Sequence, residues 1–146
     1  IEVSNVTEEQ IKNNPLSEKE AYNLLSGLML KYVSKFDKKD KFFFVGYNAN
    51  FDKNFMSEFW LRQGDKYFFS LVWGNIIDVM VLASDRLENV RAEMVDFKLM
   101  TVVQKFGIKL DETKLHDASY DIEITRDLFF LLKGLNKDKN IVKIKL

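Results

Sequence analysis

A run of four apolar residues, from Phe42 to Val45, constrains the fold of this chain more than any other stretch. The run shows no polar alternation, follows several charged residues and ends at Gly46. Such a run is typical of a strand buried on both faces, as in parallel sheets covered by helices. A segment with helical spacing of apolar residues follows and extends to about Gln63. We therefore expect an α/β fold in which this strand leads directly into a helix.

The segment after this strand contains an aspartate that we expect to face inward. The apolar residues of the following helix lie at helical spacing, at Phe55, Met56, Phe59 and Trp60. The same spacing extended backward reaches Asp52. Ligands of open α/β sheets bind at the carboxyl ends of strands, which is where Asp52 would lie.

The segment from His116 to Asp121 precedes the long apolar helix near the C-terminus and holds the only histidine of the chain. Counting forward from Asp121 at helical spacing gives an apolar stripe at Ile124, Thr125, Leu128, Leu131, Leu132 and Leu135. A carboxylate at the end of such a stripe must be hydrogen-bonded, paired or metal-bound, because ionisation is otherwise too costly. An aspartate in a first turn also complements the helix dipole, so the residues alone leave a structural role open.

Composition excludes several classes of protein. Cysteine is absent, so there is no disulfide, and any metal must bind through oxygen or the one imidazole. Lys+Arg and Asp+Glu both number 22, so no overall basic field indicates nucleic acid. No apolar run reaches the roughly 18 residues of a membrane span, and no signal-peptide pattern is present. We therefore expect a cytoplasmic protein with no membrane partner.

Capping and helix-ending signals predict the remaining helices. Capping boxes open helices over 7–15 and 17–36, and a third helix over 99–106 ends at Gly107. Two short apolar runs lead to Asp78, which we expect at the start of a further helix in a mainly structural role.

Two motifs resemble those of one family, the DEDDh 3′–5′ exonucleases of the RNase H-like fold. The segment 46–52 resembles the second family motif, a strand end followed by His-Asn-x-x-Phe-Asp. His116, Ala118 and Asp121 match the third motif, His-x-Ala-x-x-Asp, at every defined position. The resemblance covers residues 1–134. It extends to the weaker segments Val3–Glu9, Ile77–Asp78, Lys98–Leu99 and Phe106–Ile108.

This resemblance implies hydrolysis with two divalent cations, Mg²⁺ or Mn²⁺, which carboxylates from separate elements would hold. Asp121 resembles the ligand of the metal that carries the attacking water, and Asp52 resembles the carboxylate that serves the other metal. His116 would take the proton from that water, because an imidazole accepts protons near neutral pH. The implied substrate is the 3′ end of single-stranded or frayed DNA, in proofreading or repair, with a DNA polymerase as a candidate partner.

Three residues of the second motif are candidates for substrate contact. Phe51 and Tyr47 would stack on or wedge beside the terminal bases, although ordinary core packing explains them equally well. Tyr47 stands where histidine is frequent in the family, a departure that should not abolish metal binding. Asn48 lies between them and is expected to satisfy backbone groups at the strand exit.

The first family motif, Asp-x-Glu on a buried strand, is not found before Asp52. The family places it on three antiparallel strands upstream of the segment that resembles 3–9. Without those strands, 42–45 would expose an edge and the first long helix would lack its floor. We therefore expect an RNase H-like mixed sheet flanked by helices, without its N-terminal strands, in the C-terminal part of a longer polypeptide. The exonuclease domain would cover 1–134, with a tail or edge strand over 135–146.

Three alternatives stay open from the sequence. An RNA-directed member of the same family is the nearest one, because the motifs do not encode contacts to the 2′-hydroxyl. A second is a non-catalytic relative that binds nucleic acid but cannot hold both metals. A third is an unrelated α/β domain in which both motifs arise by chance.

Overall fold

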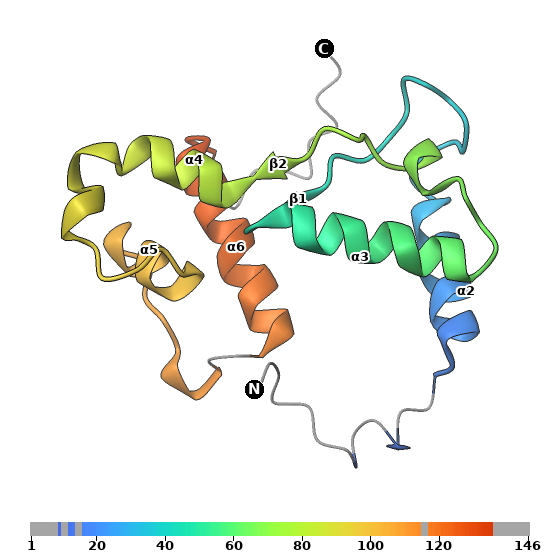
Figure 1. Cartoon of the computed structure of the whole chain (residues 1–146), viewed down its shortest axis with the longest axis horizontal. Coiled ribbons are helices and arrows are strands. Elements are labelled where there is room, and N and C mark those ends of the chain that lie inside the picture. The colour runs from blue at the N-terminus through green and yellow to red at the C-terminus, as the bar shows by residue number, and fades with distance from the viewer. Residues whose placement is uncertain (1–8, 10–11, 14–15, 115–116, 136–146) are drawn as a thin grey trace. The chain divides into compact units, whose positions relative to one another are not determined.

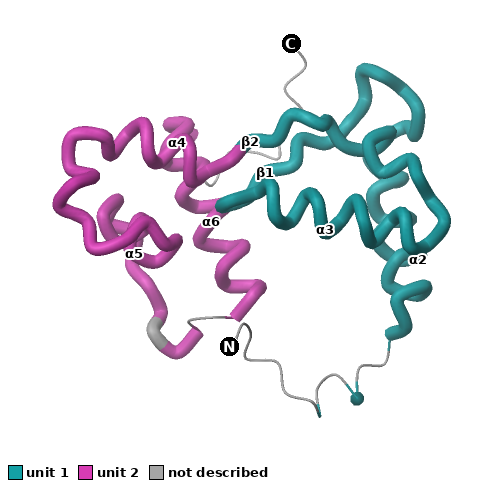
Figure 2. Tube along the Cα trace, in the orientation of Figure 1, with its two compact units in different colours: residues 1–77 teal, residues 78–146 magenta. Residues whose placement is uncertain are grey.

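The chain is mixed α/β, mostly helical, with one small parallel sheet (Figure 1). This computed structural model describes residues 9, 12–13, 16–114 and 117–135. The chain divides into two compact units, residues 1–77 and 78–146 (Figure 2). The predicted α/β class is confirmed at this level, whereas the single domain over 1–134 stays a prediction. Within the described ranges, no helix combines the length and apolarity required to cross a membrane.

Unit 1 contains helix α2 (Glu18–Met29). The predicted capping box is present: Ser17 Oγ accepts from Glu20 N at 3.3 Å, and Glu20 Oε2 accepts from Ser17 N at 2.8 Å. The helix ends at Met29, so the prediction of a helix up to residue 36 is wrong. Phe36 has a φ of +73°, which a right-handed helix cannot contain. Most of the helix predicted over 7–15 lies outside the described residues.

The sheet consists of β1 (Val45–Gly46) and β2 (Ile77–Asp78), which are parallel as predicted. Ile77 N donates to Phe44 O at 2.9 Å. An isolated parallel bridge between Phe42 and Val72 continues the pairing upstream of β1.

The prediction that this strand is buried on both faces is wrong. Phe42 and Phe44 pack against the core of unit 1, but Phe43 is 62% exposed and Val45 is 37% exposed. Successive side chains of a strand point to opposite faces. The described part of unit 1 covers one face of the strand and leaves the other open.

The core of unit 1 forms around helix α3 (Ala49–Arg62). Trp60 is fully buried, and its ring centroid lies 5.2 Å from those of Tyr22 and Phe68. The 3₁₀ helix η1 (Phe68–Ser70) follows α3. The buried side chains of this core belong to Val33, Trp60, Phe68, Leu71 and Val72.

Unit 2 is helical. Its α-helices are α4 (Val79–Arg86), α5 (Leu99–Lys105) and α6 (Ala118–Leu132). Helix α6 packs against both α4 and α5. The connections contain the 3₁₀ helices η2 (Glu88–Glu93) and η3 (Glu112–Lys114). Its fully or nearly fully buried side chains are Val79, Ala83, Leu87, Val102, Val103, Ile124, Leu128 and Leu132.

Gly107 ends α5 as predicted. Its φ is +74°, a left-handed conformation that glycine adopts without a Cβ penalty. Gly107 N donates to Gln104 O at 2.9 Å, and Ile108 N donates to Val103 O at 3.0 Å. These bonds satisfy carbonyl groups that the end of the helix would leave without partners.

Candidate functional site

Asp52 lies in the first turn of α3, and a connection of two residues separates α3 from β1. A Cβ atom on Gly46 would lie 3.2 Å from the Ala49 Cβ and 3.9 Å from Asp52 Oδ2. The strand end therefore approaches the first helical turn closely, and the carboxylate of Asp52 lies beside it. A negative charge at this position is favoured by the helix dipole.

The side chain of Asp52 is exposed, so the prediction that it faces the core is wrong for the described part of unit 1. Phe55, one turn further along the same face, is 57% exposed, whereas Trp60 is buried. Helical spacing identifies residues that share a face, but burial also requires another element to cover that face. In the N-terminal half of α3, Ala49 is buried, but Asp52 and Phe55 remain exposed.

The connection between β1 and α3 holds the three candidate substrate residues. Asn48 caps α3 in a left-handed conformation, with φ 58° and ψ 44°, and its side chain makes no capping hydrogen bond. Asparagine tolerates this conformation better than most residues do. Phe51 is 71% exposed, so core packing does not account for it, whereas Tyr47 is half-buried.

Asp121 lies in the first turn of α6 and at the end of its buried stripe. Asp117 caps the helix, since one of its carboxylate oxygens accepts from Tyr120 N at 3.0 Å. Asp121 N donates to Asp117 O at 2.9 Å, which locks the first turn. Asp121 is half-buried, and its Oδ1 atom is shielded from solvent.

The predicted buried stripe of α6 is confirmed for some of its residues but includes others that are exposed. Ile124 and Leu128 are buried, and Leu132 is nearly so. Leu131 and Leu135 are 46% and 49% exposed, so these two members of the prediction are wrong. The helix packs on α4 and α5 along a narrower line than the full apolar stripe.

Asp78 is the N-cap of α4, as predicted. Its Oδ1 atom accepts from Met80 N at 2.9 Å, which satisfies one of the helix's first amide groups. His116, the predicted proton acceptor, lies outside the described residues.

Asp52 and Asp121 offer carboxylate oxygens, the hard donors that Mg²⁺ and Mn²⁺ prefer. Asp52 belongs to unit 1 and Asp121 to unit 2. Over the residues that the structure describes, no three histidine, cysteine, aspartate or glutamate side chains gather closely enough to hold a metal ion.

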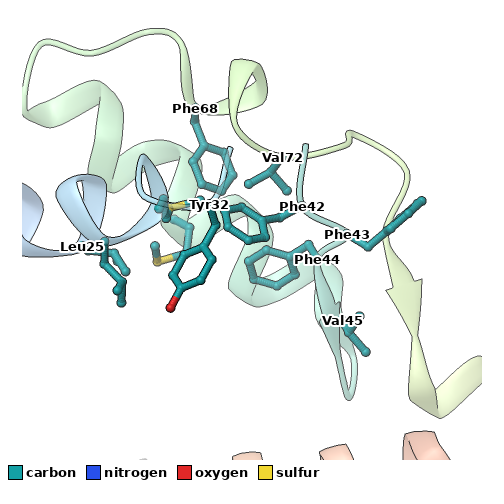
Figure 3. A pocket seen from close by; sticks show the side chains of 11 residues that line it. Leu25, Tyr32, Phe42, Phe43, Phe44, Val45, Phe68 and Val72 are labelled. Carbon is teal, nitrogen blue, oxygen red and sulfur yellow. The ribbon is translucent and has the colours of Figure 1, made fainter. Parts of the chain in front are cut away.

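An apolar groove of about 430 Å³ lies in unit 1 between α2 and the strand that leads into α3 (Figure 3). All eleven side chains that line it are apolar or aromatic. Several remain open to solvent, including Leu28 at 51% and Tyr32 at 59% exposed. The predicted α2 stripe therefore packs only partly, and α2 contains no fully buried residue.

A polar cluster around Asp65 was not predicted. Asp65 Oδ2 accepts from Tyr22 Oη and from Lys35 Nζ, both at 2.8 Å, and Oδ1 accepts from Tyr67 N at 2.8 Å. Burial opposes ionisation of Asp65, but these bonds and the Lys35 charge outweigh it and lower its pKa. Burial, together with the adjacent carboxylate, raises the pKa of Tyr22. The partners lie 43 and 30 residues from Asp65, so no local pattern could have linked them.

No known protein family matches the chain, and no curated protein or solved structure matches it either.

Proposed function

We propose that this chain forms part of a metal-dependent 3′–5′ exonuclease that shortens single-stranded or frayed DNA from its 3′ end and releases nucleoside monophosphates. One observation carries the proposal: each motif aspartate opens a helix in the local setting that its motif requires. Asp52 lies in the first turn of the helix that follows a parallel strand, and Asp121 ends a buried helical stripe with an oxygen shielded from solvent.

The residues divide the chemistry among them. Bound Mg²⁺ or Mn²⁺ would make a water nucleophilic and neutralise charge on the leaving 3′ oxygen. Asp52 and Asp121 would hold the ions through their carboxylate oxygens. His116 would accept the proton of the attacking water on an imidazole nitrogen. Phe51 would stack on the terminal base with its exposed ring, next to Tyr47 and Asn48.

The apolar groove and the open face of the strand support an RNase H-like sheet as the finer fold. Contiguous exposed apolar surface of this kind marks a place where another element packs. Further strands beside β1 would cover Phe43 and Val45 and would provide a surface for Leu28 to pack against. Strands in this position would also be suited to supply the two carboxylates of an Asp-x-Glu motif.

The test is a 3′-end degradation assay of the full-length protein on a 5′-labelled single-stranded DNA with Mn²⁺. We expect stepwise shortening and release of nucleoside monophosphates. Asp52→Asn and Asp121→Asn should each abolish turnover, because each removes a charged metal ligand but keeps the side-chain shape. His116→Ala should do the same by removing the proton acceptor.

Matched controls exist on both helices. Glu58→Gln on α3 and Glu123→Gln on α6 each remove one exposed carboxylate and should leave turnover unchanged. Circular dichroism should show that all variants remain folded. Full activity of Asp121→Asn would refute the proposal. Faster loss of a ribo-oligomer would indicate the RNA-directed alternative, and binding without degradation would indicate the non-catalytic one.

A further inference from the structure

Two segments of unit 1, residues 31–43 and 66–73, carry exposed side chains that do not line the groove, among them Phe36, Tyr67 and Phe69. The two segments lie side by side, because Trp73 N donates to Phe42 O at 2.8 Å and Phe42 forms a parallel bridge with Val72. We call the lysines of these segments, together with the exposed rings that do not line the groove, the lysine–aromatic surface.

Large aromatic rings remain exposed on this surface. The exposed fractions are 61% for Phe36, 46% for Tyr67 and 42% for Phe69. Phe36 and Tyr67 pack edge to face, with ring centroids 5.2 Å apart and planes at 79°. Scattered apolar residues are normal on a surface, but several aromatic rings on two adjacent segments indicate a binding function.

The backbone holds one of these rings outward against a conformational penalty. Phe36 has a φ of +73°, in the left-handed region that is unfavourable for a bulky residue. Among the described residues other than glycine, only Asn48 shares a positive φ. Strained residues of this kind are concentrated at functional sites.

Lysine ammonium groups lie over the rings. Lys35 Nζ lies 5.7 Å from the Tyr67 ring centroid, and Lys66 Nζ lies 5.3 Å from it. Lys41 Nζ lies 5.3 Å from the Trp73 centroid. Flat rings and positive charge therefore occur together at Tyr67 and Trp73, a combination that suits a ligand with both flat rings and negative charge.

The surface is also locally basic in a chain whose total charge is balanced. The two segments contain six lysines and only two aspartates. Both aspartates serve local turns: Asp37 Oδ1 accepts from Lys39 N at 2.8 Å, and Asp40 Oδ2 accepts from Ser34 N at 2.9 Å. The six lysines are Lys31, Lys35, Lys38, Lys39, Lys41 and Lys66, of which Lys35 is paired with Asp65, next to the second segment.

We propose that the lysine–aromatic surface binds single-stranded nucleic acid, with phosphates at the lysines and bases stacked on the exposed rings. An acidic peptide would match the charge but would leave the exposed rings without flat partners. The surface contains none of the proposed catalytic residues, which are Asp52, His116 and Asp121. Its function does not depend on the proposed hydrolysis.

The test is fluorescence anisotropy of the full chain with a labelled dT20 oligomer in EDTA, over a series of KCl concentrations. Without divalent metal, the measurement is independent of any nuclease activity. Lys38→Glu/Lys39→Glu/Lys66→Glu should weaken binding at least tenfold. It should also reduce the slope of log affinity against log salt by about 2, since each lost phosphate contact removes about 0.7. A parallel series with rU20 separates DNA from RNA as the preferred strand.

Phe36→Gly tests the ring without harming the backbone, because glycine adopts a φ of +73° freely. We expect binding at least about 5-fold weaker, the lower limit for loss of one stacked base. The charge-matched control is Lys105→Glu/Lys109→Glu/Lys133→Glu, which reverses three exposed lysines of unit 2. Equal loss of affinity in the two triple variants, or unchanged binding by Phe36→Gly, would overturn the proposal.

Discussion

Replacing Asp65 with asparagine should destabilise unit 1 more than any other single neutralisation of a carboxylate there. Asp65 Oδ2 accepts from both Tyr22 and Lys35, and Oδ1 accepts from Tyr67 N. The asparagine side chain would keep the shape, but its NH₂ group would replace one of the two acceptor oxygens and would face either Tyr22 and Lys35 or Tyr67 N. A lost charged hydrogen bond costs roughly 1.5–3 kcal/mol. The Lys35 side chain is 26% exposed, so water screens part of this interaction and we expect about 2 kcal/mol.

Urea unfolding, monitored by tryptophan fluorescence, measures this loss of stability in unit 1. Both tryptophans of the chain, Trp60 and Trp73, lie in unit 1, and Trp60 packs against Tyr22. A lower midpoint with an unchanged slope would show lost stability rather than a changed unfolded state. Asp37→Asn is the control, because its carboxylate is exposed and accepts only a local bond. A loss below about 0.5 kcal/mol for Asp65→Asn, within the usual range for a surface substitution, would refute the reasoning.

Two further predictions concern pH and the cap of α6. The pKa of Asp65 is lowered, so its contribution should be present above the ordinary aspartate range and disappear as pH falls through the lowered value. The pKa of Tyr22 is raised, so its contribution to stability should be present below the ordinary tyrosine range and disappear as pH rises through the raised value. Urea unfolding midpoints measured across pH test both predictions. In Asp65→Asn, the midpoint should depend less on pH at the acid end. Asp117→Ala removes the acceptor for Tyr120 N and should cost about 1 kcal/mol, measured by thermal unfolding in circular dichroism. An unchanged melting temperature in Asp117→Ala would contradict the assigned cap.

The local elements of both units could be predicted because their signals act over a few residues. The Ser17 capping box, the Asp78 cap and the end of α5 at Gly107 each depend on hydrogen bonds between near neighbours. A strand before α3 followed from the apolar run 42–45, although the observed strand is Val45–Gly46. Likewise, Ile124 and Leu128 lie on one buried line of α6 because helical geometry alone places them there.

The candidate site could be predicted only as a set of local positions. The motif placed Asp52 in a first turn, and the structure agrees, but its exposure was predicted wrongly. The same error affects Phe43, Phe55 and Leu131, all of which lie on apolar faces yet remain exposed. Periodicity shows which side chains share a face; whether a second element covers that face depends on distant parts of the chain.

Helix ends and caps follow from residues within one or two turns of each other, where covalent geometry limits the choices. The Asp65 cluster and the exposed rings beside Lys35 and Lys66 depend on segments far apart along the chain, as the separation of 30 positions between Lys35 and Asp65 illustrates. Such contacts form only when the unit folds and packs its core around Trp60. Their energy comes from desolvation and charge that the extended chain does not possess.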